Sequence, residues 1–66
     1  MDYSKTLLKI RAKLNLSQQE LADILKVSFT TLNRWENNKT VPSKKHLALI
    51  ESICLENNIV YMEANK

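Results

Sequence analysis

Glycine is absent from this 66-residue sequence, and proline occurs once, as Pro42. The phosphate-binding loops of P-loop and dinucleotide-binding proteins need backbone conformations that only glycine allows, so both classes are excluded. Two-residue β-hairpins are disfavoured for the same reason. The few aromatic residues, 6% of the chain, offer no stacking platform for single-stranded nucleic acid. What remains is a compact helical protein that binds a partner.

Cysteine and histidine each occur once, as Cys54 and His46. The chain therefore has neither an internal disulfide nor a four-ligand zinc site, and we expect no metal and no cofactor. No nucleophile stands beside a base in a recognisable arrangement, so we do not expect an enzyme. Short apolar runs and the lack of a signal-peptide core predict no membrane segment. An unpaired thiol then suits the reducing cytoplasm.

Charge is distributed unevenly along the chain. Ten Lys and Arg face seven Asp and Glu, for a net charge of +3. Residues 1–45 carry +5 and residues 46–66 carry −2. This asymmetry suggests an anionic partner for the first part, although ordinary solvated charge explains the counts equally well.

Apolar residues at helical spacing predict four helices, over residues 3–14, 18–25, 29–37 and 43–57. Residues 58–66 are expected as a C-terminal tail, in which residues 59–62 fit either an extended segment or a fifth helix. The expected core consists of Tyr3, Leu7, Ile10, Leu14, Leu21, Ile24, Leu25, Leu32, Trp35, Leu47, Ile50, Ile53 and Cys54.

Serine residues stand directly before two of the expected helices and at the first position of a third. Ser17 and Glu20 have the spacing of a capping box, and Ser28 and Ser43 are further N-cap candidates. His46 is expected to be exposed on the fourth helix. These local signals predict where the helices begin.

Residues 18–37 predict two short helices joined by a turn too short for an antiparallel pair. Ala22 supplies a small residue where the two helices cross. This pattern is typical of a helix-turn-helix, whose second helix enters the DNA major groove. Lys26 stands at the turn, where a positive φ would cost roughly 1 kcal/mol.

The chain resembles the phage repressor/Cro-type (Xre) family over residues 5–55. The resemblance is carried by LSQQELA at 16–22, VS at 27–28, WEN at 35–37 and PS at 42–43. The resemblance implies an all-α, compact four- to five-helix bundle of the lambda-repressor-like type. Residues 1–57 would form its helix-turn-helix DNA-binding domain. The sequence departs from the family at Lys26 and Asn38, where glycine is common.

Family positions imply roles for individual residues. Base reading falls to Phe29, Thr30, Asn33 and Arg34. Phosphate contacts are expected from Gln18, Ser28, Thr31, Asn37, Asn38, Lys39 and Lys44. For Lys44 the reason is that a cation opposing the helix dipole suggests a nearby anion. Arg11 and Glu36 match a structural ion pair between the first helix and the end of the third. Other interpretations stay open: Arg34 could hold a phosphate, Phe29 could fold into the core, and Gln18 and Lys44 could simply face solvent.

The resemblance implies a sequence-specific regulator of transcription that binds double-stranded DNA, namely a nucleoid-associated repressor that occupies an operator through the helix at 29–37. One domain of this size reads half a site, so a homodimer on an inverted repeat is expected. Residues 59–62 and the fourth helix offer the dimer surface. No small-molecule ligand is expected. The alternative is an antitoxin or adaptor-type protein-interaction module on the same fold, which salt-dependent DNA binding would distinguish.

Overall fold

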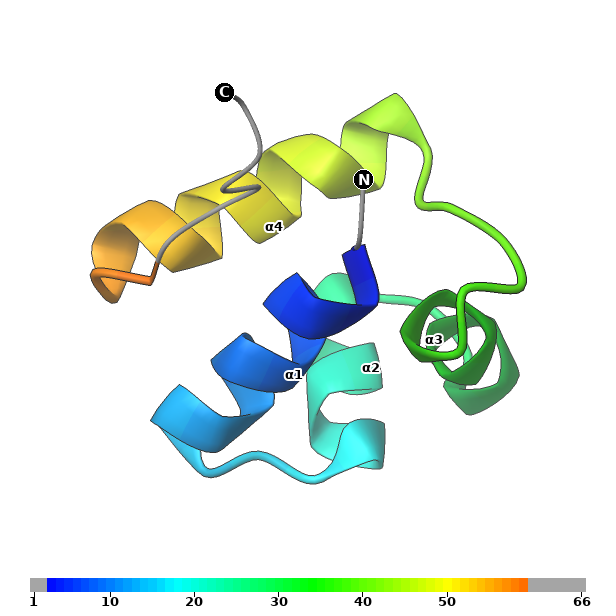
Figure 1. The fold of residues 1–66 in the computed structure, drawn as a ribbon, viewed down its shortest axis with the longest axis horizontal. Helices are drawn as coiled ribbons and strands as arrows, with labels where there is room; N and C mark the ends of the chain where they lie inside the picture. The colour runs from blue at the N-terminus through cyan, green and yellow to red at the C-terminus, as the bar shows by residue number, and fades with distance from the viewer. Residues whose placement is uncertain (1–2, 60–66) are drawn as a thin grey trace.

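Four helices and no strand make up residues 3–59, which are the residues that the computed structural model describes. They are α1 (Tyr3–Leu14), α2 (Gln18–Leu25), α3 (Phe29–Glu36) and α4 (Lys44–Glu56), shown in Figure 1. The ranges expected from the sequence agree with these bounds to within one residue, and the all-α prediction is confirmed. Of the segment 59–62, only Ile59 lies within the described residues, so the choice between tail and fifth helix stays open.

Two of the expected N-caps form in full. The Ser17 hydroxyl accepts a hydrogen bond from the Glu20 backbone N–H at 3.0 Å, and the Glu20 carboxylate accepts one from Ser17 N–H at 2.8 Å. The Ser28 hydroxyl accepts from Thr31 N–H at 3.0 Å. These contacts satisfy backbone donors that the first turns of α2 and α3 would otherwise leave unpaired.

Left-handed residues end the helices in place of glycine. Within residues 3–59, the positive-φ residues are Asn15, Lys26, Asn38 and Asn58, with φ between 57° and 60°. Asparagine tolerates this conformation better than most residues, whereas Lys26 gains nothing from its side chain there. Lys26 thus adopts the positive φ that the sequence left open, at a cost of roughly 1 kcal/mol.

The residue after each left-handed position closes the helix end with the same backbone contact. These bonds run from Leu16 N to Arg11 O, Val27 N to Ala22 O, Lys39 N to Arg34 O and Ile59 N to Cys54 O, at 2.8–3.0 Å. This is the six-to-one bond of the Schellman motif. Leu16, Val27 and Ile59 also pack against the core, which is the apolar contact that accompanies the motif.

One hydrophobic core joins the four helices. Its buried members are Leu7, Ile10, Leu21, Ala22, Leu25, Leu32, Trp35, Ile50, Ile53 and Cys54. The prediction was wrong for Ile24, which is 43% exposed. Tyr3, Leu14 and Leu47, also expected in the core, are only partly buried. The buried residues of α2 are Leu21, Ala22 and Leu25, and Ile24 lies to one side of the inward stripe that these three residues form.

His46 is partly buried, which corrects the expectation that it is an exposed bystander. Its ring centroid lies 5.3 Å from that of Trp35. Its Nδ1 is hydrogen-bonded to the Ser43 hydroxyl at 2.9 Å. The Ser43 side chain therefore makes no cap contact with the backbone of α4, which corrects the predicted role of this serine.

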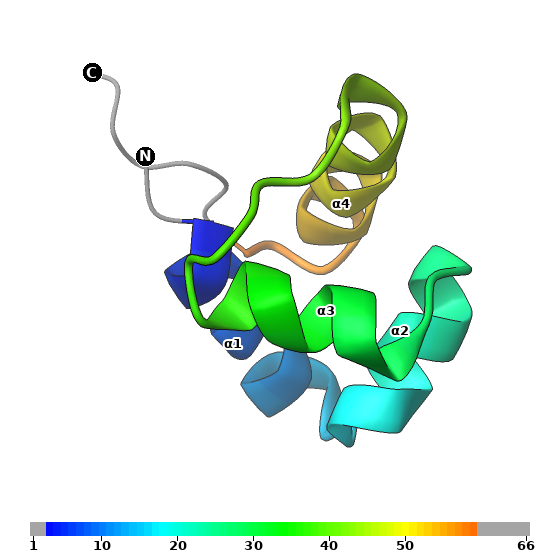
Figure 2. The same cartoon turned by 90° about the vertical axis from the view of Figure 1, so that its right-hand side faces the viewer.

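The helices leave one side of α3 uncovered. Both α3 and α4 pack against α1 and α2. In Figure 2, α3 lies across the front of the molecule with α1 and α2 behind it, and α4 lies to one side. None of the helices in residues 3–59 is long and apolar enough to cross a bilayer.

Candidate nucleic-acid interface

The outer side of α3 carries the side chains expected to read bases. Leu32 and Trp35 are buried beneath the helix. Thr30 and Arg34 are exposed, and Phe29 is 46% exposed and so lies outside the core. The sequence-based alternative of a core Phe29 is therefore wrong. The exposed side of α3 thus offers the apolar ring of Phe29, the hydroxyl and methyl groups of Thr30 and the guanidinium of Arg34.

Ser28 and Thr31 are tied to each other at the start of α3. Besides accepting the Thr31 N–H, the Ser28 hydroxyl donates to Thr31 Oγ1 at 3.0 Å. Ser28 is exposed and Thr31 is partly buried. These two side chains fix the first turn of the helix, and Thr30 between them takes no part in the cap.

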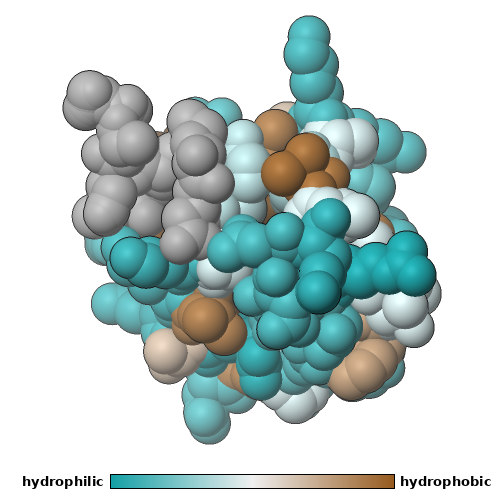
Figure 3. Space-filling model, turned by 45° about the vertical axis from the view of Figure 1, so that its right-hand side comes forward, coloured by the Kyte–Doolittle hydropathy of each residue, from teal (hydrophilic) through white to brown (hydrophobic). Residues whose placement is uncertain are grey.

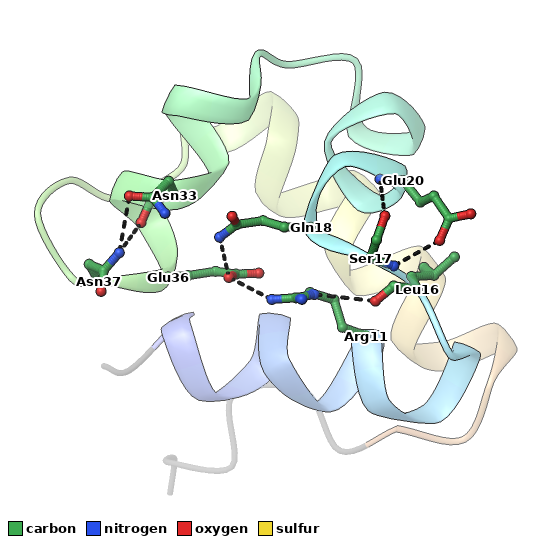
Figure 4. Close-up of polar contacts among 8 residues, drawn as sticks. All are labelled: Arg11, Leu16, Ser17, Gln18, Glu20, Asn33, Glu36 and Asn37. Atoms are coloured by element: carbon green, nitrogen blue, oxygen red, sulfur yellow. Dashed lines mark hydrogen bonds and ion pairs between the residues drawn. The ribbon is translucent and has the colours of Figure 1, made fainter.

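Asn33 and Asn37 form a second local contact, one turn apart (Figure 4). Asn37 Nδ2 donates to the Asn33 backbone carbonyl at 2.8 Å and to Asn33 Oδ1 at 3.2 Å. The amide oxygen of Asn33 is thereby turned toward Asn37, and the contact leaves its amide nitrogen unused. In this orientation Asn33 offers donors to a ligand.

A network around Glu36 links three helices. Arg11 Nη1 of α1 lies 2.9 Å from Glu36 Oε1 of α3, which is an ion pair. Gln18 Nε2, in the first turn of α2, donates to the same Glu36 oxygen at 2.7 Å. The Glu36 side chain is only 6% exposed. Figure 4 shows Arg11 and Gln18 converging on Glu36 from opposite sides.

The two oxygens of the Glu36 carboxylate differ in their hydrogen bonding. Arg11 Nε donates to the Leu16 carbonyl at 3.3 Å, which holds the guanidinium in place. Glu36 Oε2 is buried and has no hydrogen-bond partner among the described residues. One carboxylate oxygen therefore takes both side-chain donors and the other takes neither.

The surface around α3 is cationic. Residues 27–50 contain Arg34, Lys39, Lys44 and Lys45 but only one acid, Glu36. The Glu36 carboxylate is buried against Arg11, while the four cations are exposed. Asn38 is exposed beside Lys39 in the loop after α3. Figure 3 shows a mainly hydrophilic surface on this side of the molecule. Such a surface attracts polyanions.

Two contacts within the site were not predicted from the sequence. Asn33 and Asn37 have the i, i+4 spacing of a helical pair, so their hydrogen bond carries a local signal. Gln18 and Glu36 are eighteen residues apart, and no local pattern indicates their contact. In the described part of the chain, no group of three His, Cys, Asp or Glu side chains is placed to hold a metal ion.

Comparison with known proteins agrees with this arrangement. The helix-turn-helix family matches residues 7–54. The HTH-type transcriptional activator BcrR of Enterococcus faecalis is 36% identical over 50 residues, which cover 76% of this chain and 24% of the relative. The chain thus spans about a quarter of that relative's length. No solved structure matches the chain significantly.

The family match contains α2, the turn at Lys26 and α3, and extends into α1 and α4 on either side. The buried crossing of α2 and α3, with the small Ala22 fully enclosed, is the packing that such a pair requires. The chain belongs to the helix-turn-helix family of the phage repressor/Cro (Xre) type.

Proposed function

We propose that this domain binds double-stranded DNA with sequence specificity and regulates transcription, with α3 lying in the major groove. The observation that carries the proposal is the uncovered side of α3, where Phe29, Thr30 and Arg34 are exposed over a core of Leu32 and Trp35. A helix with its side chains is ~10–12 Å across, close to the ~12 Å width of the major groove. The relative BcrR, by its name a transcriptional activator, supports the proposal.

Base reading in this proposal depends on the chemistry of the exposed α3 side chains. The Arg34 guanidinium forks onto guanine O6 and N7, a contact worth ~1–3 kcal/mol of discrimination. Phe29 and the Thr30 methyl group pack against thymine methyls. Asn33, whose oxygen faces Asn37, donates from its amide nitrogen to an acceptor on a base edge.

Phosphate contacts flank these base contacts. Gln18 stands in the first turn of α2, where the positive end of the helix dipole favours an anion. In the loop after α3 and at the start of α4, Asn38, Lys39 and Lys44 are exposed and follow the sugar-phosphate chain. Ser28, Thr31 and Asn37 complete the phosphate-facing set, and they orient the first and last turns of α3.

We also propose that two copies bind an inverted repeat and that operator occupancy represses transcription. A single α3 reads about half a site, so specificity on a genome needs a symmetric pair. Residues 60–62, part of the dimer surface expected from the sequence, lie outside the described residues. A promoter reporter with the binding site overlapping or upstream of the promoter tests the sign of regulation: repression from the overlapping site supports the proposal, and activation contradicts it.

Selection of bound duplexes from a random pool tests DNA reading. The proposal predicts an enriched motif with two-fold symmetry, and affinity that falls with salt at a slope of ~0.9 per neutralised phosphate. No binding to selected or random duplexes at low salt would overturn the DNA function. That result would favour the protein-interaction module.

A further inference from the structure

We infer that Glu36 is a positioning residue for DNA binding: its buried carboxylate, held by Arg11, orients the Gln18 amide toward a DNA phosphate. The inference rests on the proposed function and names how one phosphate contact is prepared. The observation behind it is the 2.7 Å hydrogen bond from Gln18 Nε2 to Glu36 Oε1.

The acceptor decides how the Gln18 amide is turned. A carboxylate accepts hydrogen bonds and donates none, so Gln18 must direct its nitrogen, not its oxygen, toward Glu36. That nitrogen carries two N–H groups, and Glu36 Oε1 takes one of them. The other N–H remains for an acceptor outside the protein. A phosphate oxygen at the N-terminus of α2 is such an acceptor.

Burial and charge make Glu36 suited to this task. Its side chain is 6% exposed and belongs to the last turn of α3, so it is fixed before DNA arrives. Arg11, at 2.9 Å, neutralises the carboxylate, which would otherwise repel a nearby phosphate. A long polar side chain ordered in the free protein loses less conformational freedom on binding.

The uneven use of the two carboxylate oxygens separates this role from a simple ion pair. An arginine and a carboxylate pair best through two parallel hydrogen bonds, one to each oxygen. Here Oε1 takes both Arg11 and Gln18, and the buried Oε2 has no partner among the described residues. Arg11 and Glu36 therefore do not form a bidentate pair, and Glu36 Oε1 accepts a hydrogen bond from Gln18 as well.

The test is a double-mutant cycle on the affinity for the selected duplex, with Gln18→Ala, Glu36→Gln and the double variant. We expect Gln18→Ala to weaken binding by ~10-fold with an unchanged salt slope, because a neutral amide releases no counterion. Glu36→Gln should weaken binding by ~3- to 10-fold when Gln18 is present and by less than ~2-fold in the Gln18→Ala background.

Gln19→Ala is the matched control. Gln19 lies in the same turn of α2, but its amide donates to Asp23 at 2.9 Å instead of to Glu36. Its replacement should leave affinity within ~2-fold of wild type and leave the effect of Glu36→Gln unchanged. Circular dichroism checks that each variant is folded. In DNA-free protein, the side-chain amide resonances of Gln18 should shift in Glu36→Gln, while those of Gln19 should not.

Each outcome decides the matter. A Gln18-dependent loss in Glu36→Gln, together with the resonance shift, supports the inference. An equal loss with and without Gln18 means that Glu36 is only structural and overturns it. Tighter binding by Glu36→Gln means that Glu36 competes with phosphate for Gln18, which also overturns it. If wild type binds no duplex at low salt, the proposed function itself fails, and the inference fails with it.

Discussion

Trp35 and His46 lie with their ring centroids 5.3 Å apart and their planes inclined by 56°, joining the end of α3 to the first turn of α4. Trp35 is buried and His46 is partly buried. The contact spans the loop at residues 37–43, which carries Lys39. It therefore holds the loop that is proposed to contact the DNA backbone.

His46→Ala should lower the free energy of unfolding by about 1 kcal/mol, because an aromatic pair contributes about 0.5–1.5 kcal/mol beyond its buried area. Urea unfolding followed by the fluorescence of Trp35, the single tryptophan, measures the change. Lys45→Ala removes the exposed neighbouring side chain and serves as the control. Equal stability of His46→Ala and wild type would mean that the ring contact contributes nothing.

Among the left-handed residues of the described chain, Lys26 is the one that is not an asparagine, so its side chain does not favour this conformation. Lys26→Gly should raise the free energy of unfolding by about 0.5–1 kcal/mol, because glycine adopts a positive φ without the strain of a Cβ atom. Asn38→Gly, at a φ of 58°, should change stability less, since asparagine already tolerates that region. Urea midpoints of the two variants check both expectations. A less stable Lys26→Gly would show that the Lys26 side chain stabilises the turn.

Cys54 should make the free energy of unfolding depend on pH in the alkaline range. Burial raises the pKa of the Cys54 thiol above its ordinary value; Glu51 adds to the increase and Lys9 opposes it. The unfolded chain therefore loses this proton at a lower pH than the folded protein. The stability contributed by the buried thiol is complete below the unfolded pKa and is lost as pH rises toward the folded one.

Comparison of wild type with Cys54→Ala isolates this effect, because the other titrating groups are common to both proteins. In reductant at pH 7, wild type should be the more stable by about 1 kcal/mol, the order expected for a small buried side chain. The difference should shrink above pH ~9, near and beyond the ordinary pKa of cysteine. Urea unfolding at pH 7 and at alkaline pH gives both values. A difference that stays constant would contradict the assignment.

The helices could be predicted from the sequence because their signals are local. Ser17 with Glu20, and Ser28 before Phe29, indicate where α2 and α3 begin, and the structure contains both caps. The sequence predicts that the fourth helix ends at residue 57, and in the structure the left-handed Asn58 follows its end. Hydrogen bonding and backbone preference within a few residues decide these features, so one sequence is enough.

Contacts between residues distant in the sequence were harder to predict. The Arg11–Glu36 pair followed from family resemblance alone, and the sharing of Glu36 with Gln18 was not foreseen. Ile24 was assigned inward on helical spacing, although the residues of α2 that are buried are Leu21, Ala22 and Leu25. The ring of His46 against Trp35 depends on the path of the loop at 37–43, which no periodic pattern encodes. Each case depends on how helices meet in space.

The measurement that tests the reading of DNA by α3 most directly is duplex selection from one random pool, run in parallel with wild type and Arg34→Ala. Wild type should enrich a symmetric motif. Arg34→Ala should enrich the same motif with one base pair in each half-site no longer specified, because the guanidinium contact discriminates by ~1–3 kcal/mol. An identical motif for both proteins, or no motif for wild type, would contradict the account.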